Sequence, residues 1–151
     1  MIITFCGHAS YTPRVGDEER LLSLLDEIVG DSSAELYLGG YGAFDAFARR
    51  CGGKYQDTHP ATRLVFVTPY MTEEYQKSHL EPIKHIYDAI VYPPIENVPL
   101  RFAISHRNKW MAEQADVVVA YITHEFGGAY GTYKHAKRKR KTIFNLADAG
   151  F

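Results

Sequence analysis

Short apolar runs alternate with segments of helical spacing along most of the chain. The apolar runs that we predict to be strands are residues 2–6, 35–38, 64–67, 116–122 and 142–146. Strands that alternate with helices are typical of βαβ units and a parallel sheet. We therefore predict an α/β fold, a Rossmann-like doubly wound sheet that is mainly parallel and has helices on both faces. No linker or internal repeat interrupts the pattern, so residues 1–151 are predicted to form one domain.

Apolar residues at intervals of three and four predict the helices between these strands. The first begins near Val15 or Asp17 and ends at Gly30. A short second helix is expected to stop at Gly52-Gly53, a third covers about 99–114, and the last ends near Lys139. Residues 72–87 are helical in pattern but polar, and Pro82 should interrupt them. Residues 89–92 fit either a short edge strand or an extended loop.

The loops after the predicted strands carry glycine, small or polar residues. They are Gly7-His8, Gly39-Gly40, Thr68-Pro69 and Gly127-Gly128. In a doubly wound sheet, ligands bind beyond the carboxyl ends of the strands, where the strand order reverses. If the five strands lie in the order 3-2-1-4-5, that point falls between residues 2–6 and 116–122. We therefore expect the binding site there.

The strongest single signal is the loop of Gly127, Gly128, Gly131 and Thr132, which leads from a strand into a helix. A helix start presents unpaired N–H groups and the positive end of the helix dipole, which suit a phosphate. Glycine lets the backbone approach a ligand, and Thr132 adds a hydroxyl. The same glycines could serve only a tight turn. Their place after the switch-point strand favours phosphate binding.

Two charged residues are further candidates. Asp45 lies three residues after Gly42, where a carboxylate interacts favourably with the helix dipole and could also bond a ribose hydroxyl or an amine. Arg107, followed by Asn108, offers a planar guanidinium suited to phosphate. Taken alone, Asp45 is somewhat more typical of a structural position at the helix start, and Arg107 is more typical of a solvated surface charge.

The charge balance argues against nucleic acid as a partner. The chain has 17 basic and 18 acidic residues and a net charge of −1, whereas general nucleic-acid binders usually carry a basic excess. The basic run 137–141 is expected at a helix C-terminus. We identify no cofactor motif, no metal-ligand spacing, no signal peptide and no membrane-spanning segment, and expect a cytoplasmic protein without a membrane partner.

Several of these motifs together resemble the SLOG superfamily, Rossmann-like nucleotide-binding domains named for the Smf/DprA proteins and the LOG enzymes. The resemblance is carried by residues 107–111, by Ala115-Asp116 and by the loop from Gly127 to Thr132. Gly39-Gly40 with Gly42 and Asp45 is similar to the second glycine motif of the family, and Gly7-His8 to the first. Thr68-Pro69 and the polar insert after it look most like the YpsA-like branch.

The resemblance implies a protein that binds or senses a nucleotide or a nucleotide-derived signal, and self-association as a homodimer. The alternative that it implies is a phosphoribohydrolase of nucleoside 5′-monophosphates. Arg107 would then hold the phosphate, and Glu125 or Asp45 would supply the carboxylate that such hydrolysis requires. The glutamate of the LOG pattern falls on His135 here, so the sequence departs from the hydrolase at that position.

Overall fold

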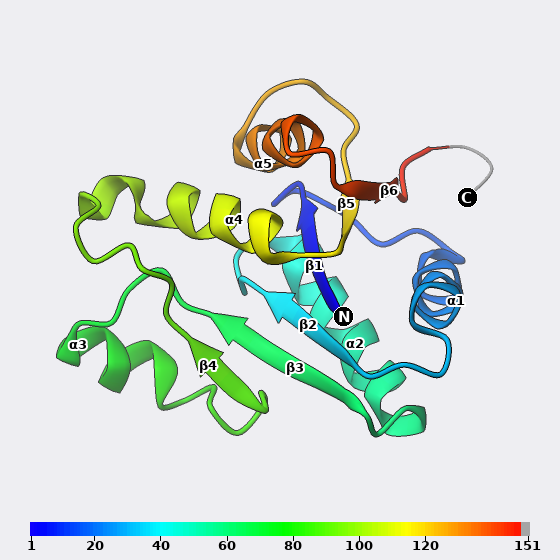
Figure 1. The fold of residues 1–151 in the computed structure, drawn as a ribbon, viewed down its shortest axis with the longest axis horizontal. Coiled ribbons are helices and arrows are strands. Elements are labelled where there is room, and N and C mark those ends of the chain that lie inside the picture. The colour runs from blue at the N-terminus through cyan, green and yellow to red at the C-terminus, as the bar shows by residue number, and fades with distance from the viewer. Residues whose placement is uncertain (149–151) are drawn as a thin grey trace.

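A six-stranded sheet forms the centre of the computed structural model, which describes residues 1–148. Every pair of neighbouring strands is parallel. The strands are β1 (Ile2–Gly7), β2 (Ala34–Leu38), β3 (Thr62–Val67), β4 (Ala89–Val91), β5 (Val117–Tyr121) and β6 (Thr142–Asn145). Their order is β4-β3-β2-β1-β5-β6 (Figure 1). The prediction of a parallel, doubly wound α/β sheet is therefore confirmed.

The order of the strands reverses at β1. Ile3 of β1 pairs with Leu36 of β2 on one side and with Val117 of β5 on the other. From β1 the chain first builds the sheet outward through β2, β3 and β4, then returns to add β5 and β6. The loops after β1 and β5 consequently meet at the carboxyl edge of the sheet.

Helices cover both faces of the sheet (Figure 1). They are α1 (Asp17–Val29), α2 (Ala43–Thr58), α3 (Glu73–Tyr75), α4 (Ala103–Gln114) and α5 (Gly128–Arg138). On one face, Leu25 of α1 and Phe44 of α2 belong to the main apolar cluster with Ile3. On the other face, Ala112 of α4 and Ala136 of α5 pack with strand residues in a second cluster. None of the described helices is long and apolar enough to cross a membrane.

The second helix differs from its prediction, because α2 continues through Gly52-Gly53 to Thr58. Interior glycines cost a helix about 1 kcal/mol each, but packing can outweigh that cost. A Cβ at Gly52 would lie 3.0 Å from Leu36 and 3.1 Å from Leu64, so this glycine lets α2 lie close to the sheet. Tyr55, beyond the two glycines, is buried in the same cluster.

Residues 72–102 contain little regular structure. After α3, the chain forms a π-helical turn at Gln76–Leu80 and then β4, which is the short edge strand that the sequence left open. A 3-10 turn at Leu100–Phe102 precedes α4. The helical segment that the polar pattern predicts thus runs from Glu73 to Leu80, partly as a π-helical turn, and stops before Pro82 as expected.

Candidate functional site

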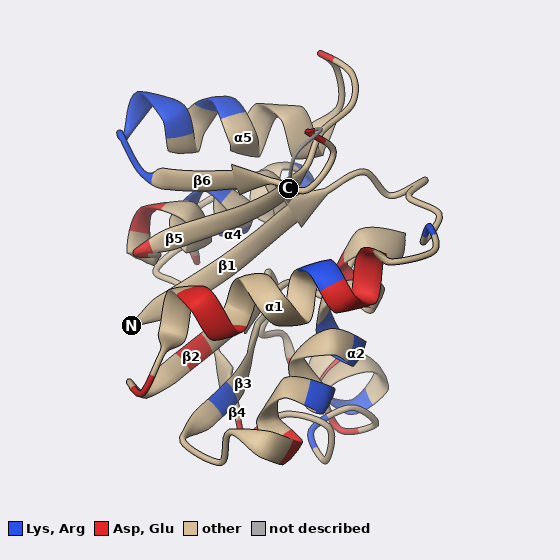
Figure 2. Ribbon diagram, turned by 90° about the vertical axis from the view of Figure 1, so that its right-hand side faces the viewer, with Lys and Arg blue, Asp and Glu red and all other residues tan. Residues whose placement is uncertain are grey.

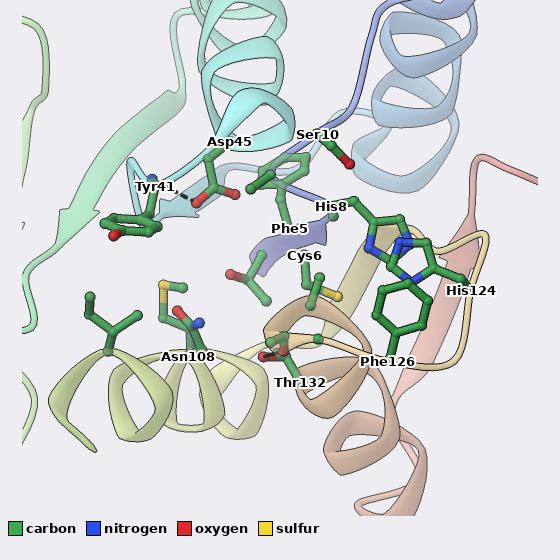
Figure 3. Close-up of a pocket in the computed structure, with 18 residues that line it drawn as sticks. Phe5, Cys6, His8, Ser10, Tyr41, Asp45, Asn108, His124, Phe126 and Thr132 are labelled. Carbon is green, nitrogen blue, oxygen red and sulfur yellow. Dashed lines mark hydrogen bonds between the residues drawn. The ribbon is translucent and has the colours of Figure 1, made fainter. Parts of the chain in front are cut away.

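A cleft of about 420 Å³ opens at the carboxyl edge of the sheet, at the point where the strand order reverses (Figure 3). Its walls come from the end of β1, the start of α2, one face of α4, and the loop that begins α5. The lining residues are Thr4, Phe5, Cys6, Gly7, His8, Ala9, Ser10, Tyr41, Asp45, Ile104, Asn108, Met111, His124, Phe126, Gly127, Gly128, Ala129 and Thr132. No Lys or Arg is among them.

The structure divides the site residues that the sequence singled out. Those that line the cleft are Gly7, His8, Asp45, Asn108, Gly127, Gly128 and Thr132. Those placed outside the lining are Gly39, Gly40, Thr68, Arg107, Gly131 and Glu125. The loops predicted to meet do meet, but only part of each loop faces the cleft.

The first turn of α5 is open to the cleft. Its N-cap, Gly127, has a φ of 89° and no side chain that caps the helix. The N–H groups of Gly128 and Ala129 have no acceptor within the part of the chain that the structure describes, as is usual for first-turn amides. A Cβ on Gly128 would meet no atom within 4 Å. These amides and the helix dipole together provide a site for one small anion.

Thr132 lies one turn further along α5 and is buried at the cleft wall. Its hydroxyl donates a hydrogen bond of 3.1 Å to the carbonyl of Gly128. The hydroxyl proton is therefore already engaged, and the oxygen remains able only to accept.

Asp45 is the one carboxylate of the lining. Its Oδ2 accepts a hydrogen bond of 3.0 Å from the N–H of Tyr41. Burial raises the pKa of Asp45 to about 6, although the Tyr41 N–H and the charge of Arg107 act in the opposite direction. The carboxyl group therefore changes charge close to neutral pH, which is a common property of functional carboxyls.

Arg107 has a different role from the one that the resemblance implies. Its side chain is only 1% exposed, and its Nη1 donates to the carbonyls of Gly39 at 3.0 Å and Val67 at 2.6 Å. Its Nε donates to Oδ1 of Asn108 at 2.8 Å. The guanidinium joins the ends of β2 and β3 and holds the side-chain oxygen of Asn108, a residue of the cleft lining.

Gly7 and Gly40 serve packing. A Cβ on Gly7 would lie 2.2 Å from the Phe44 ring, so this glycine lets α2 approach the end of β1. Gly40 has a φ of 67°, and a Cβ there would lie 2.6 Å from Phe66. These contacts explain why glycine occupies the two positions, and no bound ligand is needed to account for them.

Cys6 also faces the cleft from β1. Burial, and to a lesser extent the charge of Asp45, raises the pKa of its thiol to about 12. The thiol stays protonated at neutral pH, so Cys6 contributes a packed wall and not a nucleophile.

The sequence prediction missed the aromatic side chains of the cleft. His124 and Phe126 come from the loop after β5, and Tyr41 comes from the loop after β2. Phe126 and Tyr41 are 68% and 65% exposed. The sequence signal for this wall is an aromatic residue directly beside a glycine run, in a loop that follows a strand.

The comparisons with known proteins give a likeness of fold. No family model and no curated protein matches the sequence. DNA processing protein A from Helicobacter pylori, whose unique single-stranded DNA binding mode has been characterised structurally, aligns with a TM-score of 0.62 at 16% identity. The X-ray structure of DprA from Streptococcus pneumoniae aligns with a TM-score of 0.64 at 13% identity. These alignments cover 96% and 95% of this chain, and 64% and 49% of the two proteins.

One partner prediction is wrong in view of this likeness. We argued from the net charge that nucleic acid is not a partner, yet a protein of the same fold binds single-stranded DNA. The net charge misleads because it averages over the surface: six of the 17 Lys and Arg residues lie in 134–141, and residues 128–141 contain no Asp or Glu. Figure 2 shows these cations at the C-terminal end of α5.

Both fold neighbours are DNA processing proteins. At these identities the likeness is one of fold, and it does not distinguish the YpsA-like branch. The chain thus has the Rossmann-like fold of DNA processing protein A, with a cleft at its switch point.

Proposed function

We propose that this chain binds a nucleotide or a nucleotide-derived signalling ligand in the cleft at the switch point, as a ligand-binding or sensing protein. One observation carries the proposal: the uncapped first turn of α5 opens into a cleft of about 420 Å³. Pockets of roughly 300–1,000 Å³ hold small molecules and cofactors. The pairing of an anion site with a cavity of this size suits a phosphorylated nucleoside.

Different residues of the cleft bind different parts of the ligand. The Gly128 and Ala129 amides hold the phosphate. Asp45, across the cleft on α2, and Asn108, on α4 beside α5, bond to sugar hydroxyls or to an amine of the base. Because Lys and Arg are absent from the lining, the site offers charge for one phosphate group better than for a chain of them. A monophosphate is therefore the expected ligand class.

Hydrolysis of the ligand has less support than binding. Glu125 is exposed and lies outside the lining, and the guanidinium of Arg107 is occupied by backbone carbonyls. Asp45 remains as the carboxyl group, and its pKa of about 6 would suit a general acid. A hydrolase of this kind would depend on Asp45 alone.

The test combines binding with product analysis. AMP and ATP are added to the pure protein, and thermal unfolding is followed together with chromatography for released adenine. AMP at 100 times its Kd should stabilise the fold by about 2.7 kcal/mol. Gly128→Val should abolish this effect, because its side chain fills the space that the phosphate needs.

A matched control lies one turn away. Gly131 also has open space around its Cβ position but does not line the cleft, so Gly131→Val should bind AMP as the wild type does. Adenine release that disappears in Asp45→Asn would establish the hydrolase instead. Normal AMP binding by Gly128→Val would show that the phosphate is not held at α5.

Single-stranded nucleic acid is a second candidate, favoured by the outer face of α5. Lys134 lies 5.0 Å from the ring centre of Tyr130, and Lys137 lies 5.2 Å from that of Tyr133. Cations interleaved with aromatic rings suit the phosphates and bases of a single strand. A fold neighbour binds such DNA.

This candidate has a separate test. Binding of a fluorescent oligothymidylate is measured against salt concentration, for the wild type and for the double variant Lys134→Gln with Lys137→Gln. If the strand lies on α5, affinity falls steeply with salt, and the double variant binds more weakly and with a smaller salt slope. An unchanged slope would exclude this face of α5.

A further inference from the structure

Three rings form a column on one wall of the cleft (Figure 3). The rings of His8 and His124 are stacked, with centroids 3.6 Å apart and an angle of 12° between their planes. The ring of Phe126 stacks on His124, with a centroid distance of 3.8 Å and an angle of 19°. The residues come from the loop after β1 and from the loop after β5, so folding brings the column together.

The inner end of the column is held in place by the backbone. Nε2 of His8 accepts a hydrogen bond of 3.0 Å from the N–H of Thr123. This bond requires a neutral imidazole with its proton on Nδ1, and burial together with the charge of His124 lowers the pKa of His8. His8 is only 6% exposed, so the base of the column is rigid and uncharged at neutral pH.

The outer end of the column is uncovered. Phe126 has its inner face against His124, yet 68% of the residue is exposed. An apolar ring held at this exposure loses the free energy that burial would give. The same rigid support makes its open face a flat surface that another ring can cover without loss of side-chain freedom.

The position of Phe126 relates this surface to the anion site. Phe126 directly precedes Gly127, the N-cap of α5, and both residues line the cleft. A flat ring on Phe126 and a phosphate on the Gly128 amide would thus belong to one small molecule. That combination is the chemistry of a nucleotide.

We propose that the outer face of Phe126 stacks on the base of the bound nucleotide, and that the His8–His124–Phe126 column is the base-recognition surface of the cleft. The inference rests on the proposed function, since it takes the phosphate to lie at α5. Stacking accepts any base, because every base has a π-face. The column therefore distinguishes ligands with a base from ligands without one.

The experiment compares AMP with ribose 5-phosphate, which has the same phosphate and sugar and no base. Calorimetric titration of the wild type should show AMP binding roughly 5- to 150-fold more tightly, which is the usual gain from one stacked base. Phe126→Ala should reduce AMP to the affinity of ribose 5-phosphate, and Phe126→Tyr should retain the gain. In NMR spectra, the adenine H2 and H8 signals should move upfield with wild-type protein and not with Phe126→Ala.

Phe102→Ala is the matched control, because Phe102 is also an exposed phenylalanine but lies outside the lining of the cleft. This variant should keep both the affinity gain and the upfield shift. Retention of the gain in Phe126→Ala would overturn the proposal. Equal binding of AMP and ribose 5-phosphate, abolished in both by Gly128→Val, would overturn base stacking and leave the proposed function intact. Failure of both compounds to bind would overturn both.

Discussion

Gly7, at the end of β1, and Gly128, at the start of α5, both line the cleft, but their surroundings differ. The Cβ position of Gly7 is occupied by the Phe44 ring at 2.2 Å, whereas that of Gly128 has no atom within 4 Å. Gly7 allows a side chain of the protein to pack against the backbone, whereas Gly128 leaves the backbone accessible to a ligand. The same residue type after a strand thus indicates packing in one loop and binding in the other, and only the neighbours decide which.

The largest effect should come from filling the closed position. Gly7→Val would force the Phe44 ring from its place, and overpacking of this kind costs about 3 kcal/mol or more. The free energy of unfolding, measured with urea, should fall accordingly. A urea midpoint equal to that of the wild type would show that the packing around Gly7 accommodates a larger side chain. Gly7 and Gly128 would then not differ in the way proposed.

A slightly smaller loss is expected from Arg107→Met, which removes a cation from the same closed region. The carbonyls of Gly39 and Val67 would lose their donor, and each buried group left unpaired costs roughly 1–3 kcal/mol. Unfolding in urea at pH 7 should show a loss of about 2–3 kcal/mol. If instead stability is unchanged and only AMP affinity falls, Arg107 acts on the ligand as the family resemblance implies.

Asp45→Asn should stabilise the protein, with an effect that depends on pH. The folded-state pKa of about 6 exceeds the ordinary value of 3.8, so the stability that Asp45 contributes is present below pH 3.8 and is lost as pH rises through 6. Each unit corresponds to about 1.4 kcal/mol. Allowing for partial exposure, the variant should gain about 2 kcal/mol at pH 8 and almost nothing at pH 4. An equal gain at both pH values would place the pKa of Asp45 in its usual range.

The smallest change in stability should follow Gly128→Val, the counterpart of Gly7→Val. Its side chain would enter open space, so the free energy of unfolding should change by no more than about 0.5 kcal/mol. Urea unfolding without ligand is the measurement. A loss as large as that of Gly7→Val would mean that the first turn of α5 is packed and not open.

Much of the fold could be predicted from local pattern. The run Leu64-Val65-Phe66-Val67 has the continuous apolar character of a strand covered on both faces, and β3 is indeed buried, with a paired strand on each side. Alternation of strands and helices predicted a parallel sheet, and the reversal at β1 agrees with the order that we took as a condition for placing the site. The end of α2 could not be predicted in this way, because Gly52 acts through its contacts with Leu36 and Leu64 and not through its own propensity.

The candidate site was predictable only in outline. The Gly127-Gly128 loop was found from its place in the chain, and the structure puts it in the cleft lining. Arg107 could not be assigned, because burial by β2 and β3 is a property of the folded sheet. The stack of His8 on His124 joins residues more than a hundred positions apart, and no periodicity reports such a contact.

The uncapped turn at Gly127 has a practical consequence for solution work. Backbone amides bind an oxyanion according to its size and charge and do not distinguish phosphorus from sulfur or arsenic as its central atom. Sulfate, arsenate and inorganic phosphate should therefore compete with any phosphorylated ligand for α5. Affinities determined in phosphate buffer, or soaks into crystals grown from ammonium sulfate, would understate how tightly the natural ligand is held.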